Sequence, residues 1–369
     1  MKQLESAIQK RANRRSFLKN GIAAAGVVTV GGGMLSSGLS ALGAEGGITE
    51  GVASILRFLA AAEILETDLW QQYTELAGVD APASGYQTGL QQLDGDMPQY
   101  ISDNTDDELS HELFINAYLK SKGAKPVDLE KFRTLEGSEV TDIPGIDGKK
   151  RLTNLMQLSV DTSWWTRYRS SDKNPDFGDT FPNAVPTLAA GKFPAIPRNN
   201  AELQIGVTDP NLVSNHTQAI SNTAGFHFAF IEQGGTSLYA SIAQKVTSLE
   251  VLRIVLSIGG TEIMHFQTWH DKAGNAIPLT DGALVFPDLK NDIPQPESLQ
   301  SNLIMPEPTV FISKKLPVCS IIRPTAPKGV AMGAVKGLTN DGLFINQSPD
   351  FFEFLMDLAR EADEAKREI

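Results

Sequence analysis

"GGTEIMHFQTWHD", residues 259–271, has the periodicity of an amphipathic helix but carries ionisable side chains on the face that should be buried. Steps of three or four residues place Glu262 and His265 on one stripe with Val255 and Trp269. An unpaired carboxylate is costly to bury, so a protein avoids it, pairs it or gives it to a metal. The stretch therefore predicts a helix with a functional group on its inner face.

Three other segments show the same kind of pattern. The four predicted helices span residues 49–78, 103–122, 215–246 and 248–272. Asn104 or Thr105 is expected to cap the second helix, and Gly123 to stop it. Each of the four places at least one carboxylate on its inner stripe, which predicts a mainly α protein with a polar centre.

The spacing of these inner residues repeats along the chain. An inner Glu with an aromatic residue seven positions later is followed by a helix that carries Glu-x-x-His. The repeated pairs are Glu63–Trp70 followed by Glu108–His111, and Glu232–Tyr239 followed by Glu262–His265. Residues three apart lie on the same side of a helix, so each Glu-x-x-His offers an oxygen and a nitrogen donor to a common point. One such motif is a weak signal, but the repeat predicts one shared site built by two helix pairs.

The residue types restrict the chemistry of that site. Cys319 is the only cysteine, which excludes an intramolecular disulfide and a thiolate cluster, so a metal would need oxygen and nitrogen ligands. Four carboxylates and two neutral imidazoles carry a charge of −4, which two divalent cations cancel. An oxygen-rich set with two histidines suits iron or manganese better than structural zinc.

A metal-free alternative remains open at this stage. The inner Glu and His side chains could form a hydrogen-bonded polar network without metal, or Arg57 and Arg253 could neutralise part of their charge. Two arginines offset so many acids poorly, which favours the metal site. Tyr73 and Tyr239 are either redox-active or part of an aromatic core, and core is the favoured interpretation.

The helical motifs have a family resemblance. "AEILETDLW", "DELSHELF", "FIEQGGTSLY" and "GGTEIMHFQTWH" resemble the four helices of the ferritin-like di-iron and di-manganese carboxylate superfamily, in its exported branch related to desiccation-related proteins. The resemblance implies a ferritin-like four-helix bundle over about 130 residues. It also implies a centre of two Fe or two Mn ions. Its ligands would be Glu108 and Glu262 as bridging carboxylates, Glu63 and Glu232 as terminal ones, and His111 and His265 as one nitrogen ligand for each metal.

Further acids and glycines accompany that ligand set. Glu66 and Glu112 also face inward and are expected to support the ligands, with Glu66 an alternative to Glu63 as a ligand. The pairs Gly234–Gly235 and Gly259–Gly260 lie within a turn of a proposed ligand. They serve either close helix packing or room for dioxygen, peroxide or water beside the metals.

The N-terminal segment 1–44 resembles a twin-arginine signal peptide, with paired Arg14 and Arg15 before an apolar run at 21–35. Six Lys or Arg and one acid give this segment a charge of +5, so the rest of a −12 chain carries −17. The resemblance implies cleavage near 41–47, a periplasmic or otherwise extracytoplasmic location, and the twin-arginine export machinery as a partner. The apolar run is short for a permanent anchor, so no stable membrane insertion is expected after cleavage.

Domain organisation follows from where the helical pattern stops. We expect the bundle to span 45–272, with a long Pro-rich crossover insertion at about 124–212. A Pro-rich extension, 273–369, has short strands in "TVFIS" (309–313) and "VCSIIR" (318–323) and ends in an amphipathic helix with Ser348 as its cap. That helix either docks onto the bundle or binds a partner.

These features predict redox chemistry with dioxygen or peroxide, or metal handling in stress protection. Two alternatives accompany this prediction: a non-enzymatic desiccation- or stress-related protein with a metal-free bundle, and a manganese catalase. Beyond residue 44 the chain is acidic and has no basic cluster, which argues against nucleic acid as a partner. The sequence leaves the oligomeric state open.

Overall fold

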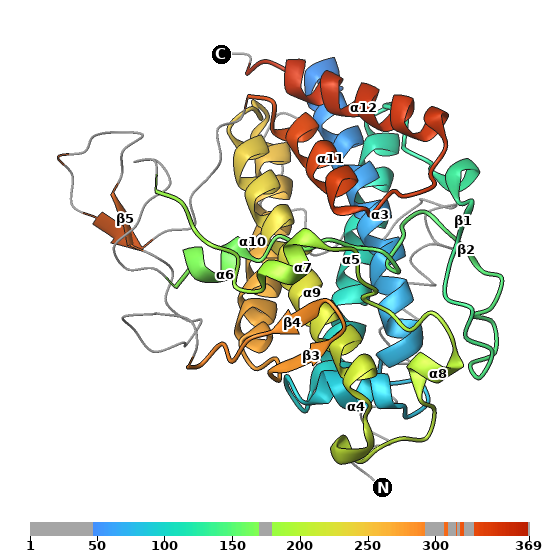
Figure 1. The fold of residues 1–369 in the computed structure, drawn as a ribbon. Helices are drawn as coiled ribbons and strands as arrows, with labels where there is room; N and C mark the ends of the chain where they lie inside the picture. The colour runs from blue at the N-terminus through green and yellow to red at the C-terminus, as the bar shows by residue number, and fades with distance from the viewer. Residues whose placement is uncertain are drawn as a thin grey trace, which may run out of the picture.

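Four long helices form the centre of the fold. The computed structural model describes residues 47–169, 179–291, 306–308, 315, 318–320 and 328–367. The long helices are α3 (Glu50–Ala77), α5 (Met97–Ser121), α9 (Asn215–Ala243) and α10 (Leu249–Ala273), which lie side by side in Figure 1. The closest pairings are α3 with α5 and α9 with α10. The predicted mainly α four-helix bundle is thus confirmed.

The ends of these helices follow local chemistry. The side chains of Thr49, Ser214 and Ser248 accept hydrogen bonds from backbone N–H groups in the first turns of α3, α9 and α10. The start predicted for the second helix was wrong, because α5 begins six residues earlier, at Met97. Pro98 suits the first turn of a helix, where a missing N–H costs nothing. Gly123 follows the helix with a φ of 75°, consistent with the predicted stop.

The predicted caps of α5 have other roles. Asn104 and Thr105 are both buried in the second turn. The Thr105 hydroxyl donates to the Ile101 carbonyl at 2.7 Å, and the Asn104 side chain points toward neighbouring helices. A polar residue near the start of an apolar run is typical of a helix cap, but Asn104 instead hydrogen-bonds a side chain at the centre of the bundle.

Short elements fill the long crossover between α5 and α9. They are η1 (Glu130–Phe132), β1 (Leu135–Glu136), β2 (Lys150–Arg151), α6 (Ser163–Arg167), α7 (Pro186–Ala190), α8 (Asn200–Leu203) and η3 (Pro210–Leu212). The strands β1 and β2 are antiparallel, with Leu135 opposite Arg151. Two further helical and sheet features flank the bundle: α4 (Gly85–Gln91) links α3 to α5, and the hairpin of β3 (Leu279–Asp281) and β4 (Leu284–Phe286) follows α10.

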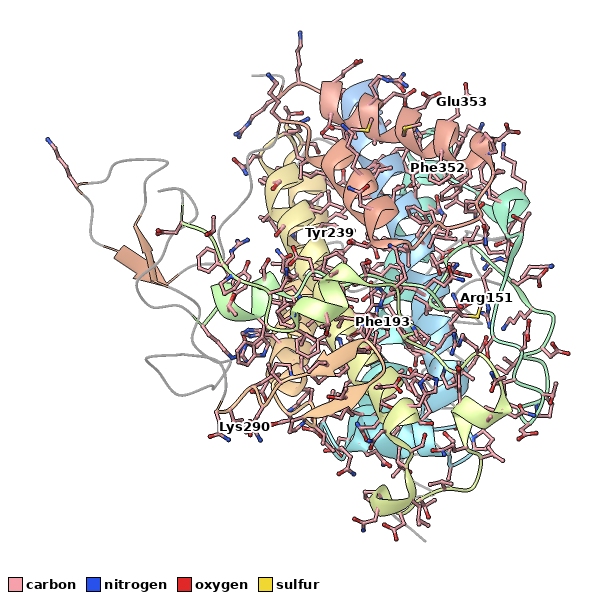
Figure 2. All side chains as sticks on the ribbon, viewed as in Figure 1. Arg151, Phe193, Tyr239, Lys290, Phe352 and Glu353 are labelled. Atoms are coloured by element: carbon pink, nitrogen blue, oxygen red, sulfur yellow. The ribbon has the colours of Figure 1, made fainter. Side chains whose placement is uncertain are left out.

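The C-terminal segment packs onto the bundle. Its elements are the antiparallel pair β5 (Pro306–Pro308) and β6 (Val318–Ser320), then α11 (Val330–Asp341) and α12 (Pro349–Glu364). Helix α12 contacts α3 and α11 contacts α9, and both lie across the bundle in Figure 1. In Figure 2 the labelled Glu353 of α12 lies at the outer surface and Tyr239 within the bundle. The docked alternative for the amphipathic helix is confirmed, with Ser348 as its cap.

Two other C-terminal expectations have mixed outcomes. The predicted strand 309–313 lies outside the described residues, whereas β6 covers the first three residues of the other predicted strand. No helix among the described residues is long and apolar enough to cross a membrane. The helix α11 was not predicted, and three of its twelve residues are Gly or Asn, which are poor helix formers.

A buried carboxylate joins the crossover to α3. Asp68 is 1% exposed, and its Oδ2 accepts hydrogen bonds from the backbone N–H groups of Leu152 at 3.0 Å and Thr153 at 2.9 Å. The guanidinium of Arg133 pairs with its other oxygen. This one side chain therefore fixes two parts of the crossover against the bundle.

We expect Asp68→Asn to lower the free energy of unfolding by about 2–4 kcal/mol, because two backbone N–H groups of the crossover lose a charged acceptor and the partly exposed Arg133 loses the buried one of its two counter-charges. Urea denaturation would measure the loss. Glu130→Gln is the matched control, because Glu130 also pairs with Arg133 but its side chain is 66% exposed, so a change below about 1 kcal/mol is expected. Equal losses in the two variants would contradict the anchoring role.

Candidate metal centre

The bundle brings the six predicted donor residues to one point. Glu63 comes from α3, Glu108 and His111 from α5, Glu232 from α9, and Glu262 and His265 from α10. All six are buried by their neighbours, and three of the carboxylates are 0% exposed. Two overlapping groups result: Glu63, Glu108, His111 and Glu262; and Glu108, Glu232, Glu262 and His265. In each group the donor atoms lie within 4.8 Å of one another.

Glu108 lies between the two histidine rings. Its Oε2 is 3.0 Å from Nδ1 of His111, and its Oε1 is 2.9 Å from Nδ1 of His265. His111 Nδ1 also lies 3.4 Å from Glu63 Oε2, and His265 Nδ1 lies 3.2 Å from Glu232 Oε2. Both imidazoles thus present the same ring nitrogen to the centre, as the repeated Glu-x-x-His spacing requires.

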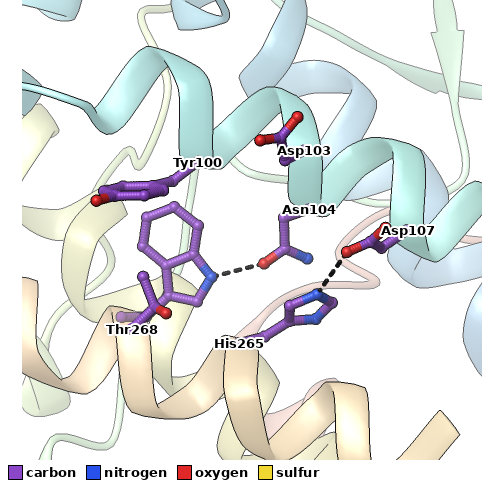
Figure 3. Close-up of a pocket in the computed structure, with 7 residues that line it drawn as sticks. Tyr100, Asp103, Asn104, Asp107, His265 and Thr268 are labelled. Atoms are coloured by element: carbon purple, nitrogen blue, oxygen red, sulfur yellow. Dashed lines mark hydrogen bonds and ion pairs between the residues drawn. The ribbon is translucent and has the colours of Figure 1, made fainter. Parts of the chain in front are cut away.

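Neighbouring polar groups hold several of these side chains. The Asn104 Nδ2 group donates to Glu108 Oε1 at 2.8 Å and to Glu232 Oε1 at 2.9 Å. Its Oδ1 accepts from the Trp269 indole N–H at 2.7 Å, as Figure 3 shows. The Tyr239 hydroxyl donates to Glu63. Sequence reasoning missed Asn104, although its position four residues before Glu108 was a usable signal.

An aspartate orients one of the imidazoles. Asp107 Oδ2 lies 3.2 Å from His265 Nε2, the contact drawn in Figure 3. A carboxylate on one ring nitrogen favours a proton there and leaves Nδ1 as the donor atom toward the centre. Asp107 therefore acts as a positioning residue outside the set of six.

Burial and charge shift the pKa values of the centre in opposite directions. Burial raises the pKa of Glu63 to about 7, and it raises the pKa of Glu262 well above the ordinary range. Burial also opposes ionisation of Glu108, but hydrogen bonds from the two histidines lower its pKa to about 2. Burial opposes protonation of His111, yet hydrogen bonds to Glu108 and Glu63 raise its pKa to about 11. Protons and cations therefore compete for the same buried atoms.

Several observations indicate that these residues fit metal ions. Both side-chain oxygens of Glu262 are buried without a hydrogen-bond partner among the described residues, and Glu63 Oε2 has only the long 3.4 Å contact with His111. Such orphaned acceptors are costly unless a cation or proton satisfies them. In the described chain the ion pairs of the centre are made by histidines. Two ions sharing Glu108 and Glu262 would satisfy both donor groups.

The arginine-neutralised network is wrong. Arg57 pairs with Glu50 at 2.7 Å and with Glu361 at 3.2 Å, both away from the centre. Arg253 is exposed on α10. Neither guanidinium reaches the buried carboxylates, because each lies on the outer part of its helix.

The remaining sequence candidates divide clearly. Glu66 belongs to neither donor group, and Glu112 is half-buried with a pKa that burial raises. The Tyr73 hydroxyl lies 2.7 Å from His227 Nδ1 and its ring packs on Phe228, so Tyr73 is part of the aromatic core as predicted. Tyr239, by contrast, hydrogen-bonds a donor residue of the centre.

The glycines also have separate roles. A Cβ on Gly235 would lie 2.0 Å from Glu262 Oε2, so only glycine leaves room for that carboxylate. A Cβ on Gly259 would lie 2.9 Å from Tyr239 Cβ, which is a close packing contact. A Cβ on Gly234 or on Gly260 would have no other atom within 4 Å.

Comparison with known proteins agrees with this geometry. The family model of the ferritin-like domain matches residues 51–274, more than half of the chain and a span that includes all six donor residues. The chain belongs to the ferritin-like domain family. No curated protein and no solved structure matches it.

We expect Gly235→Ala to weaken metal binding by at least about tenfold, because the added methyl displaces Glu262 from the shared position. Metal content after dialysis against a chelator of known affinity would report the loss. Gly234→Ala is the matched control on the same helix, because its methyl would meet nothing and alanine favours a helix by about 1 kcal/mol. Equal metal content in the two variants would count against a role for Glu262.

The apparent metal affinity should rise with pH. The pKa of Glu63 is about 7 and that of His111 about 11, so a bound cation must displace protons from both groups. The apparent metal affinity therefore increases with pH. At a pH below the pKa of a group, displacing its proton changes that affinity by about tenfold per pH unit. Chelator competition between about pH 5.5 and 7.5 would measure the slope. An affinity that does not change over this range would contradict the protonation scheme.

Proposed function

We propose that this protein binds two Fe or two Mn ions and performs redox chemistry with dioxygen or peroxide, or handles metal in stress protection. One observation carries the proposal. Two buried donor groups, each with one histidine, share Glu108 and Glu262. This arrangement is what a pair of adjacent cations needs, and an oxygen-rich set with two imidazoles suits iron or manganese.

Each donor residue has a distinct part in the proposal. Glu108 and Glu262 would bridge the two ions, since both belong to both groups. Glu63 with His111, and Glu232 with His265, would complete one ion each. When bound, such ions supply electron transfer and Lewis acidity at one buried point.

The protein's own groups would prepare the site for this chemistry. Asn104 holds Glu108 and Glu232 at a fixed separation, and Asp107 sets the tautomer of His265. The Tyr239 hydroxyl can hold or give a proton at Glu63, because it donates to that carboxylate. Helices on all sides exclude bulk water from the four glutamates.

A polar pocket lies beside His265, one of the six donor residues. It has a volume of about 90 Å³ and is lined by residues of α5 and α10 that include Asp103, Asn104, Asp107 and His265 (Figure 3). Carboxylates at the mouth attract cations and tolerate small polar molecules. We infer that metal ions and peroxide enter between α5 and α10.

The proposal includes export before the protein acts. Arg14, Arg15 and the apolar run that follows support transport by the twin-arginine machinery and an extracytoplasmic location. These residues lie outside the described part of the chain. A protein exported after folding could acquire its metals in the cytoplasm, which suits a buried centre.

The decisive experiment is metal analysis of the full chain, followed by dioxygen- and peroxide-consumption assays. We expect about two Fe or Mn ions per chain and turnover of at least one oxidant. Glu262→Gln should lose metal and turnover while it keeps the fold, because glutamine preserves the shape but removes the bridging charge. Glu112→Gln, which changes an acid outside the donor set on α5, should leave metal content unchanged.

Two results would overturn parts of the proposal. Stoichiometric zinc without turnover would remove the redox chemistry. A protein whose unfolding temperature changes neither with added metal nor in Glu262→Gln would favour the non-enzymatic alternative. Two Mn ions with fast peroxide disproportionation would instead identify catalase activity.

A further inference from the structure

A second, apolar pocket lies on another side of the bundle. We call it the apolar chamber; it has a volume of about 70 Å³ between α3, α9 and the end of α11. Its apolar walls include Leu65 and Leu69 from α3, Ile231 and Leu238 from α9, and Leu338 and Leu343 from the C-terminal segment. The polar pocket is instead formed by α5 and α10. The two pockets therefore approach the centre between different pairs of helices.

One polar side chain lines this chamber. The lining residues are apolar or glycine except for Glu66, whose Oε1 is buried without a hydrogen-bond partner among the described residues. A buried carboxyl oxygen without a partner is unusual and costly in a folded protein. Glu66 belongs to neither of the two donor groups of the centre.

The chamber also adjoins the metal centre. Gly235 is buried in the chamber wall, and a side chain there would collide with Glu262 Oε2 at 2.0 Å. Glu66 lies one helical turn beyond Glu63 on α3. A molecule in the chamber would thus lie next to a shared carboxylate of the centre.

At the rim the chamber is open. Gly234 is exposed, lines the chamber, and has nothing within 4 Å of the place where a Cβ would be. Glycine inside a helix costs about 1 kcal/mol relative to alanine. Close packing does not explain a glycine at position 234, whereas keeping the opening of the chamber free of a side chain does.

We infer that the apolar chamber binds a small uncharged organic molecule, with its apolar body against the leucines and a single hydrogen-bonding end at Glu66. A short alcohol or an organic hydroperoxide has this chemistry. A lining with a single polar side chain excludes sugars and nucleotides, which need several polar partners, and a wall without cationic side chains next to several carboxylates excludes anions. The inference deepens the proposed function, because the polar end would lie beside the metal centre.

Binding can be tested separately from redox activity. Ligand-observed NMR with 1-butanol and with tert-butyl hydroperoxide on the full chain, with and without metal, should show saturable binding in both forms. Gly234→Leu should weaken binding at least about tenfold, since its side chain would fill the rim. Gly260→Leu is the matched control: a helical glycine with the same free space, exposed on α10 and outside the chamber.

Glu66 variants test the polar end. Glu66→Gln should bind butanol within about threefold of the parent, because an amide can still hydrogen-bond, whereas Glu66→Leu should lose about tenfold for butanol but retain xenon, a purely apolar probe. Leu338→Trp fills the chamber from α11 and replaces Gly234→Leu should that variant fail to fold. Unchanged butanol binding in both filled variants, or in Glu66→Leu, would overturn the inference.

The outcomes separate this inference from the proposed function. Butanol binding without stoichiometric Fe or Mn would support the chamber as a binding site but contradict the proposal that it adjoins a redox centre. Full metal content and peroxide turnover without saturable butanol binding would overturn the chamber alone.

Discussion

Four glutamates and two histidines buried at one point impose the main constraint on this fold. The carboxylate charges repel one another and are poorly solvated inside the bundle, so the centre is stable only with protons or cations between the carboxylates. The chain supplies histidines, an asparagine and a tyrosine there, and directs Arg57 and Arg253 elsewhere. The arrangement of the surrounding helices is consistent with keeping that point accessible to metal ions.

The two halves of the repeat are similar in their donors but differ around them. Tyr239 donates to Glu63, whereas Trp70, its counterpart in the other half, has a buried indole N–H without a partner among the described residues. Asn104 and Asp107 support the donors from α5, and an isoleucine and a threonine stand at the corresponding places in α10. The two donor groups of this centre therefore have unequal surroundings.

The environment of the centre divides by chemistry. Acidic and aromatic side chains of α5 and α10 line the polar pocket, while leucines of α3, α9 and the segment around α11 line the apolar chamber. Ions and small polar molecules partition into the first, and uncharged apolar molecules into the second. Helix α11 and the turn after it, which lie outside the region matched by the family, contribute Leu338 and Leu343 to the chamber.

The sequence by itself determined the four helices and which six Glu and His residues cluster at the centre, because helical periodicity fixes which side chains share a face and the repeated Glu-x-x-His indicates a common target. It also predicted that α12 is amphipathic, from Phe351, Leu355 and Ala362 on one stripe. Only the tertiary structure decided that Asn104 supports the centre instead of capping a helix, that Glu66 faces a chamber, and that Gly235 makes room for Glu262. Those roles depend on which side chains of distant segments meet, and local periodicity carries no information about that.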